Sequence, residues 1–270
     1  MKSEFSFDEV WYHYLTGEWR VPPPLSQRVI AWIEQKLFRF LPSDPHCVEC
    51  GVPMAGIGGM LLRFYGSAPS SFSSIFCSGC ERIARKKESG AEIELTLLFA
   101  DVRDSTPLAE STPTIEYKAL IQRFYKETSH LLVHHRSMVN RLMGDQVSAL
   151  FTPRFAGKEH ARVAVEAAKA LLEVTGQGNS AGAWVPVGVG VHTGQAYVGA
   201  VGSGDGVNEI AVLGSAANLC ARLSSQASAG EILVSEATAE LAGKQAEGQE
   251  RRVLNLKGIA GQVPVRVMTL

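Results

Sequence analysis

Two aspartates, Asp101 and Asp145, have the residue type and the setting for metal-dependent chemistry. Asp101 closes the apolar run in "LLFADVRDST", and Asp145 stands in the turn "MGDQ" between two stretches that read as strands. If the strand ending at Asp101 lies beside that hairpin, both carboxylates emerge at the same end of a sheet. Carboxylates so placed can hold Mg²⁺ together with substrate phosphates, and two such ions can activate a hydroxyl and stabilise a leaving phosphate. The alternative is that Asp101 is only a turn residue.

The segment "VRDST" directly after Asp101 offers successive backbone N–H groups that open toward a helix. Such a geometry can cradle phosphates. We therefore expect Arg103, Asp104, Ser105 and Thr106 to contact substrate phosphates. Asp104 equally fits the N-cap of the following helix.

Asn218 and Arg222 in "SAANLCARLSS" are four residues apart, so they share one face of a predicted helix. An asparagine can bind a ribose oxygen, and an arginine can neutralise the charge on a transferring phosphoryl group. An ordinary solvent-facing helix would carry the same residue types.

Four of the five cysteines form two CxxC pairs in "HCVECG" and "FCSGCE". Cys47, Cys50, Cys77 and Cys80 together match the four thiolates of a tetrahedral structural Zn²⁺. An iron–sulfur cluster and free or redox thiols are the alternatives. A closed site would organise this glycine-rich segment, which has few apolar residues of its own.

The overall composition predicts a globular protein and gives no reason to expect a nucleic-acid or anionic-membrane partner. The 270 residues are 46% hydrophobic and 20% charged, with a net charge of -1. No apolar run approaches the roughly 18 residues that span a bilayer, and the first residues do not resemble a signal peptide. We therefore expect a cytoplasmic protein without a transmembrane segment.

Three segments follow from the pattern along the chain: residues 1–41, residues 42–90 and residues 91–270. The first contains an amphipathic helix that starts near Ser26 and stops at Pro42. Its basic residues are compatible with a membrane surface, but packing on the main domain or at a dimer interface is the commoner arrangement. The second should contain only short regular elements and the cysteines.

Strands and helices alternate in the third segment, which predicts a sheet with helices on one face. The expected strands lie at 93–102, within 138–151, as a pair within 185–202, after 230 and within 251–270. The expected helices lie at 114–135, 158–176 and 215–227.

Five blocks resemble, in order, the motifs of class III nucleotidyl cyclases: "FADVRDST", "NRLMGDQV", "VGVHTGQAYVGAVG", "LGSAANLCARL" and "GEILVSEAT". The resemblance implies an α+β, ferredoxin-like catalytic domain with an antiparallel-rich sheet, preceded here by the helical segment and the Cys₄ module. In that family two active sites lie at the interface of a head-to-tail dimer, so a homodimer is expected. The implied reaction converts a nucleoside triphosphate to a 3′,5′-cyclic mononucleotide and pyrophosphate with two Mg²⁺ or Mn²⁺ ions.

The family's functional residues map onto this chain by position. Asp101 and Asp145 match the metal-binding aspartates, and the carbonyl of Val102 matches an additional ligand. Asn218 matches the residue that orients the ribose, and Arg222 matches the transition-state arginine that the partner subunit donates. Lys257 in "LKG" lies near a family lysine that meets the terminal phosphates.

The two positions that select the base depart from the family. Adenylate cyclases typically carry a lysine and an aspartate where this chain has Arg141 and Ala211. Ala211 cannot accept the adenine amino group, and arginine has only donors, which suit the carbonyl oxygens of uracil. The glutamate that guanylate cyclases carry at position 141 is also missing, although Glu209 could supply an acceptor.

A similar loss of the adenine pair is seen in the pyrimidine cyclases of the bacterial Pycsar antiphage system. We therefore predict conversion of UTP to cyclic UMP as an antiphage messenger. The alternatives are an adenylate cyclase that makes cyclic AMP and a catalytically inactive domain that binds nucleotide.

Overall fold

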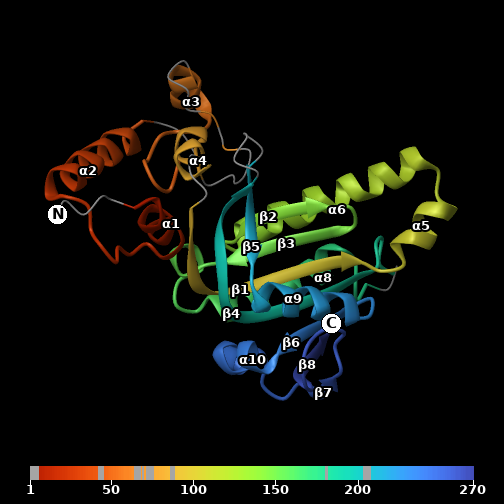
Figure 1. The fold of residues 1–270 in the computed structure, drawn as a ribbon. Helices are drawn as coiled ribbons and strands as arrows, with labels where there is room; N and C mark the ends of the chain where they lie inside the picture. Colours follow the sequence, from red (N-terminus) through yellow and green to blue (C-terminus); the bar gives the residue numbers. More distant parts are fainter. Residues whose placement is uncertain are drawn as a thin grey trace. The chain divides into compact units, whose positions relative to one another are not determined.

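The protein is described from a computed structural model, which covers residues 6–41, 46–63, 68, 70, 76–85, 89–179, 182–202 and 208–270. The fold divides into two compact units (Figure 1), one of residues 1–93 with 197–212 and the other of residues 94–196 with 213–270. The expected boundaries at residues 41 and 90 stay a prediction. In the part of the chain that the structure describes, no helix has the length and apolar character needed to cross a bilayer.

Regular elements alternate along the chain. The helices are α1 Phe7–Thr16, α2 Leu25–Arg39, α3 Gly56–Arg63, α4 Ser78–Arg85, α5 Ser105–Ser111, α6 Thr114–His134, α7 Pro153–Ala156, α8 His160–Val174, α9 Ser215–Gln226 and α10 Glu236–Ala242, followed by a short 3₁₀ turn at Gly243–Gln245. The strands are β1 Gly90–Val102, β2 Met138–Met143, β3 Gln146–Phe151, β4 Val187–Gly202, β5 Asn208–Leu213, β6 Glu231–Ser235, β7 Glu250–Leu254 and β8 Val263–Thr269.

One mixed sheet holds all of these strands. Its order is β2-β3-β1-β4-β6-β8-β7, and β5 pairs with β4. The β1–β3, β2–β3, β6–β8 and β7–β8 pairs are antiparallel, while β4 and β6 run parallel. The expected α+β fold with an antiparallel-rich sheet is therefore confirmed.

The sequence "VGVGV" at the start of β4 explains how the sheet is covered on both faces. Val187, Val189 and Val191 enter the large core beneath α8. Gly188 and Gly190 point to the other face, where a Cβ on Gly190 would lie 2.3 Å from the backbone nitrogen of Ser224 in α9. Glycine therefore allows the α9 backbone to rest directly on the strand. The expectation that helices cover one face is wrong, because α9 packs opposite α8 (Figure 1).

Two further local expectations also differ from the structure. The expected strand pair within 185–202 is one continuous strand, β4, of 16 residues. The amphipathic helix α2 begins at Leu25 with Pro24 as N-cap, and no side chain caps it. A separate helix, α1, precedes α2 and was not expected.

The N-terminal unit is organised around α1 and the cysteines. The Ser6 hydroxyl caps α1, and the Asp8 carboxylate in its first turn accepts a hydrogen bond of 3.1 Å from the backbone N–H of Gly90. The ring of Tyr14, buried on α1, stacks at 5.3 Å on Phe76, which directly precedes Cys77. The short helices α3 and α4 agree with the expectation of short regular elements in residues 42–90.

Candidate active site

Strand register brings the two predicted metal ligands to the same end of the sheet. β1 pairs antiparallel with β3 so that Asp101 lies opposite Gln146, the residue after Asp145. The backbone N–H of Val102 donates to the Asp145 carbonyl at 3.0 Å. Both carboxylates are half-buried. Burial raises the pKa of Asp101, Arg103 lowers it, and the neighbouring Asp145 raises it again. A bound cation would relieve the repulsion between the two carboxylates.

Arg103 has its own protein partners beside this carboxylate. Its guanidinium forms an ion pair with the Asp101 carboxylate and donates to the carbonyl of Ser225 at 3.0 Å. These contacts tie the end of β1 to the end of α9. The expected contact of Arg103 with substrate phosphates stays a prediction.

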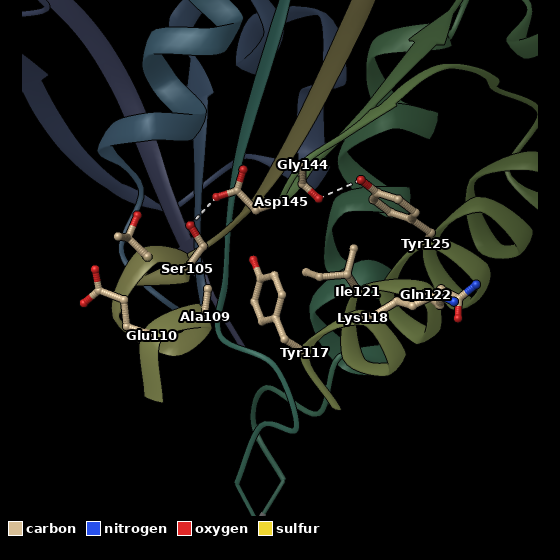
Figure 2. A pocket seen from close by; sticks show the side chains of 11 residues that line it. Ser105, Ala109, Glu110, Tyr117, Lys118, Ile121, Gln122, Tyr125, Gly144 and Asp145 are labelled. Atoms are coloured by element: carbon tan, nitrogen blue, oxygen red, sulfur yellow. Dashed lines mark hydrogen bonds between the residues drawn. The ribbon is translucent and has the colours of Figure 1, made fainter. Parts of the chain in front are cut away.

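Two hydroxyl groups hold Asp145 and its turn. The Ser105 hydroxyl donates to the Asp145 carboxylate, and the Tyr125 hydroxyl on α6 donates to the carbonyl of Gly144 at 2.6 Å (Figure 2). Burial and the negative charge of Asp145 raise the pKa of Tyr125, which keeps this hydroxyl a donor. The sequence indicated Ser105 only as a phosphate-binding residue and did not indicate Tyr125, because its partner is a backbone atom 19 residues away.

A pocket of about 710 Å³ opens beside these hydroxyls, between α5, α6 and the β2–β3 turn. This volume lies within the range of small-molecule sites. Figure 2 shows the Tyr117 ring in the pocket with its hydroxyl toward Ser105 and Asp145. The lining residues are Ser105, Thr106, Ala109, Glu110, Tyr117, Lys118, Ile121, Gln122, Tyr125, Gly144 and Asp145.

In the predicted phosphate-binding segment "VRDST", only some of the backbone N–H groups are available to a ligand. The N–H of Val102 is bonded to Asp145, and the N–H of Arg103 donates to the Pro186 carbonyl at 2.8 Å. Phosphate contacts here would therefore use the amides of Asp104 and the following residues at the start of α5. Asp104 has a left-handed backbone (φ 52°) and an exposed side chain that makes no capping hydrogen bond.

Asn218 and Arg222 lie on the exposed side of α9. Their neighbours Cys220 and Leu223 are buried against the sheet, which turns positions 218 and 222 outward. Among the described residues, no hydrogen bond or ion pair holds either side chain. Two exposed polar side chains four residues apart, on one side of the helix, are suited to a ligand or to a partner surface.

The remaining predicted positions, which would bind the terminal phosphates and the base, are distributed over both units. Lys257 is exposed in the turn between β7 and β8, in the second unit. Ala211 is half-buried on β5, in the first unit. Arg141 is on β2, but its side chain lies outside the described part of the structure.

The four cysteine sulfurs come together in the N-terminal unit with the spacing of a tetrahedral metal site. All four lie within 4.8 Å of one another. The Cys47 and Cys80 sulfurs are 3.8 Å apart, and those of Cys50 and Cys77 are 3.6 Å apart. Four sulfurs at the Zn–S distance of about 2.3 Å would be separated by about 3.8 Å. The residues therefore fit one Zn²⁺ ion, whereas an iron–sulfur cluster would place its thiolates on separate iron atoms, farther apart.

Backbone donors favour thiolates at this cluster. The N–H of Cys77 donates to the Cys47 sulfur at 3.3 Å, and the N–H of Cys80 donates to the Cys77 sulfur at 3.4 Å. The hydrogen bond with Cys50 lowers the pKa of Cys47 to about 7, and the same interaction raises the pKa of Cys50, so the pair shares one proton. Thiolate is the form that binds metal.

His192 has a structural environment. Its Nδ1 lies 2.8 Å from the Ser235 hydroxyl, which also caps α10. Burial lowers the pKa of His192 to about 4, so the ring is neutral near pH 7.

Comparison with known proteins identifies the fold. Residues 88–269 match the family model described as "Adenylate and Guanylate cyclase catalytic domain". An "Adenylate cyclase" of Mycobacterium tuberculosis (strain ATCC 25618 / H37Rv) is 30% identical over 169 residues, which cover 61% of this chain and 37% of that protein.

Solved structures agree with this match. The guanylyl cyclase Cya2 aligns with a TM-score of 0.58 at 26% identity, over 66% of this chain and 92% of that chain. The adenylyl cyclase CyaB from P. aeruginosa aligns with a TM-score of 0.58 at 25% identity, over 67% and 96%.

The first curated relatives match over only 24% of their own length, so the chain corresponds to a limited part of them. The family model nevertheless matches about two thirds of this chain, from residue 88 to residue 269. The chain belongs to the adenylate and guanylate cyclase catalytic domain family, the class III nucleotidyl cyclases.

Proposed function

We propose that the protein is a nucleotidyl cyclase that converts a nucleoside triphosphate to a 3′,5′-cyclic mononucleotide and pyrophosphate. The observation that carries this proposal is the β1–β3 register, which brings Asp101 and Asp145 to one end of the sheet beside an open pocket. Carboxylates in this arrangement suit two Mg²⁺ or Mn²⁺ ions, with the Val102 carbonyl as a further ligand. Such ions lower the pKa of the ribose 3′ hydroxyl and neutralise charge on the phosphates.

The chain's own residues would hold the substrate for this reaction. The start of α5, including Asp104, Ser105 and Thr106, would meet the phosphates, and Lys257 would meet their terminal end. Ser105 and Tyr125 would keep the Asp145 turn in place through their hydrogen bonds.

The active unit would be a homodimer. Asn218 and Arg222 are exposed and make no hydrogen bond or ion pair within the described part of the chain, so they are available to a second subunit. Asn218 would orient the ribose, and Arg222 would stabilise the charge that develops on the transferred phosphorus group. A twofold dimer would then contain two sites, each with residues from both subunits.

We infer that UTP is the preferred substrate, with cyclic UMP as an antiphage messenger. Arg141 and Ala211 support this assignment because together they offer donors and no acceptor at the two positions that would face the base. ATP is the second candidate, because the M. tuberculosis relative is named an adenylate cyclase.

A substrate survey tests both levels of the proposal. The purified protein is incubated separately with UTP, ATP, CTP and GTP and with Mn²⁺ or Mg²⁺, and products are identified by mass. A cyclic product that disappears in Asp101→Asn but persists in Glu240→Gln, an exposed acidic position on α10, supports a cyclase. No cyclic product from any nucleotide would leave only the inactive nucleotide-binding alternative, and preference for ATP would remove the uridylate assignment.

We also propose that Cys47, Cys50, Cys77 and Cys80 hold one structural Zn²⁺. The sulfur spacing supports zinc, and the ion would stabilise the N-terminal unit. Metal analysis of the purified protein should give one zinc per chain, and iron or no metal would contradict the assignment.

A further inference from the structure

Helix α2 contacts the rest of the N-terminal unit with the side that carries Gln35 and Phe38, the half-buried residues among its described side chains. The Gln35 side-chain amide donates to the backbone carbonyl of Glu49 at 3.2 Å. The Gln35 backbone is so close to Gly51 that a Cβ on this glycine would lie 2.8 Å from the Gln35 carbonyl oxygen. The side of α2 that carries Gln35 therefore faces the segment 47–51 around the first cysteine pair, which we call the cysteine loop. Most large apolar side chains of α2 lie on the other side, unlike in an ordinary amphipathic surface helix.

The opposite side of α2 is apolar and exposed. At 100° per residue, its large apolar side chains cover about half of the helix circumference. Trp32 is 60% exposed and the C-terminal Phe40 is 86% exposed. The full set is Leu25, Val29, Ile30, Trp32, Ile33, Leu37 and Phe40.

Helix α3 has the same inverted orientation. Its two glycines, Gly58 and Gly59, are buried, while Ile57, Met60 and Leu61 are exposed. A Cβ on Gly58 would lie 3.5 Å from the Leu41 side chain, so α3 starts beside the end of α2. We call these ten exposed apolar residues, nine on α2 and α3 and Phe40 at the C-cap of α2, the α2–α3 face.

The charges on the two helices themselves are mainly positive. α2 and α3 carry Arg28, Lys36, Arg39 and Arg63 against the single acid Glu34, a net charge of +3 within a chain of net charge -1. Apolar and aromatic side chains next to arginine and lysine are typical of helices that lie in the interfacial plane of an anionic bilayer. A twofold pair would instead place the same positive patch against itself. The charge therefore favours a lipid surface over a second copy.

We propose that the α2–α3 face docks the protein on membranes that contain anionic lipids. The apolar side chains enter the headgroup–acyl boundary, and the basic residues bind the lipid headgroups. This role is separate from the reaction of the cyclase domain.

Flotation of the full chain with lipid vesicles tests the docking. We expect binding to phosphatidylcholine vesicles that contain phosphatidylglycerol to be at least about tenfold stronger than to phosphatidylcholine alone. The double variant Ile33→Glu, Leu37→Glu should lose at least about tenfold in binding. Leu241→Glu, a matched exposed leucine on α10, should bind like the wild type.

The charge contribution has its own variants. Arg28→Gln and Arg39→Gln should each weaken binding to the anionic vesicles about fivefold and leave binding to neutral vesicles unchanged. The Trp32 fluorescence should shift to shorter wavelength on binding, and Trp32→Phe should remove that shift. An unchanged melting temperature and zinc content in every variant establish that the fold is intact.

A wild-type protein that stays unbound in the presence of anionic vesicles would overturn the proposal. A change of oligomeric state in Ile33→Glu, Leu37→Glu, measured by light scattering, would then assign the face to a second copy. Binding of Ile33→Glu, Leu37→Glu to anionic vesicles at the wild-type level would also overturn it.

Discussion

Mixing two inactive variants tests whether each active site is shared between subunits. Asp101→Asn removes one carboxylate of the metal pair, and Arg222→Ala removes the exposed cation on α9. Each variant alone should lose at least about a hundredfold in turnover, because charge stabilisation of this kind is typically worth that much. Each homodimer carries its own defect in both sites.

The magnitude of recovery follows from the twofold arrangement. In a heterodimer, one site combines the altered carboxylate position of one chain with the altered arginine position of the other, and the second site receives both native residues. Free exchange of equal amounts makes half of the dimers mixed, with one working site of two, so the mixture should recover about a quarter of wild-type activity.

The assay is cyclic nucleotide formation after the two variants are mixed at concentrations that allow subunit exchange. As a matched control, Asp101→Asn is mixed with Asp145→Asn, which should recover nothing because both defects fall in the same half of the site. Failure of the Asp101→Asn and Arg222→Ala mixture, with subunit exchange shown by differently tagged chains, would refute the shared site.

The other predictions concern the supports of the site and of the fold. Tyr125→Phe removes the hydroxyl that donates to the Gly144 carbonyl. The Mn²⁺ concentration for half-maximal activity should rise about three- to tenfold, since one hydrogen bond is worth about 1 kcal/mol. An unchanged metal dependence would exclude this positioning role. Burial lowers the pKa of His192 from 6.5 to about 4, so between these pH values the folded state binds fewer protons than the unfolded state. The free energy of unfolding should therefore fall by up to about 3 kcal/mol as the pH drops from 6.5 to 4. Unfolding of His192→Asn over that pH range should show a shallower dependence, and an equal slope would contradict the assignment. Cys50→Ser should reduce bound zinc and lower the melting temperature of the N-terminal unit, as measured by zinc release and calorimetry; retention of one tightly bound zinc would contradict a four-thiolate site.

Local patterns in the sequence were sufficient for most of the fold. Period-two and period-3.6 apolar spacing located β1, α6, α8 and α9, because burial of one face imposes these periods. The two CxxC pairs predicted a common metal site, and the structure brings the four sulfurs together. The N-cap of α2 was missed because Pro24 supports the helix start through its backbone geometry, without a side-chain cap.

The candidate site was predictable where it depends on single residues. Asp101, Asp145, Asn218 and Arg222 have side chains whose chemistry can be read from their type. Their roles stay predictions, but their placement at one strand end and on one exposed helix side agrees with the expected geometry.

The sequence by itself determined which residues can bind metal, neutralise phosphate and ligate zinc, because these properties belong to side-chain chemistry and short spacing. Tertiary structure alone decided which partners those side chains have. Only the register of β1 on β3 brings residues 44 positions apart to one edge, and only packing gives Asp145 its hydroxyl from Ser105. The orientation of α2 is also a tertiary property. The apolar spacing along α2 would be the same whether its apolar side faced the protein or the solvent. The contact of Gln35 with the cysteine loop places the apolar side toward the solvent.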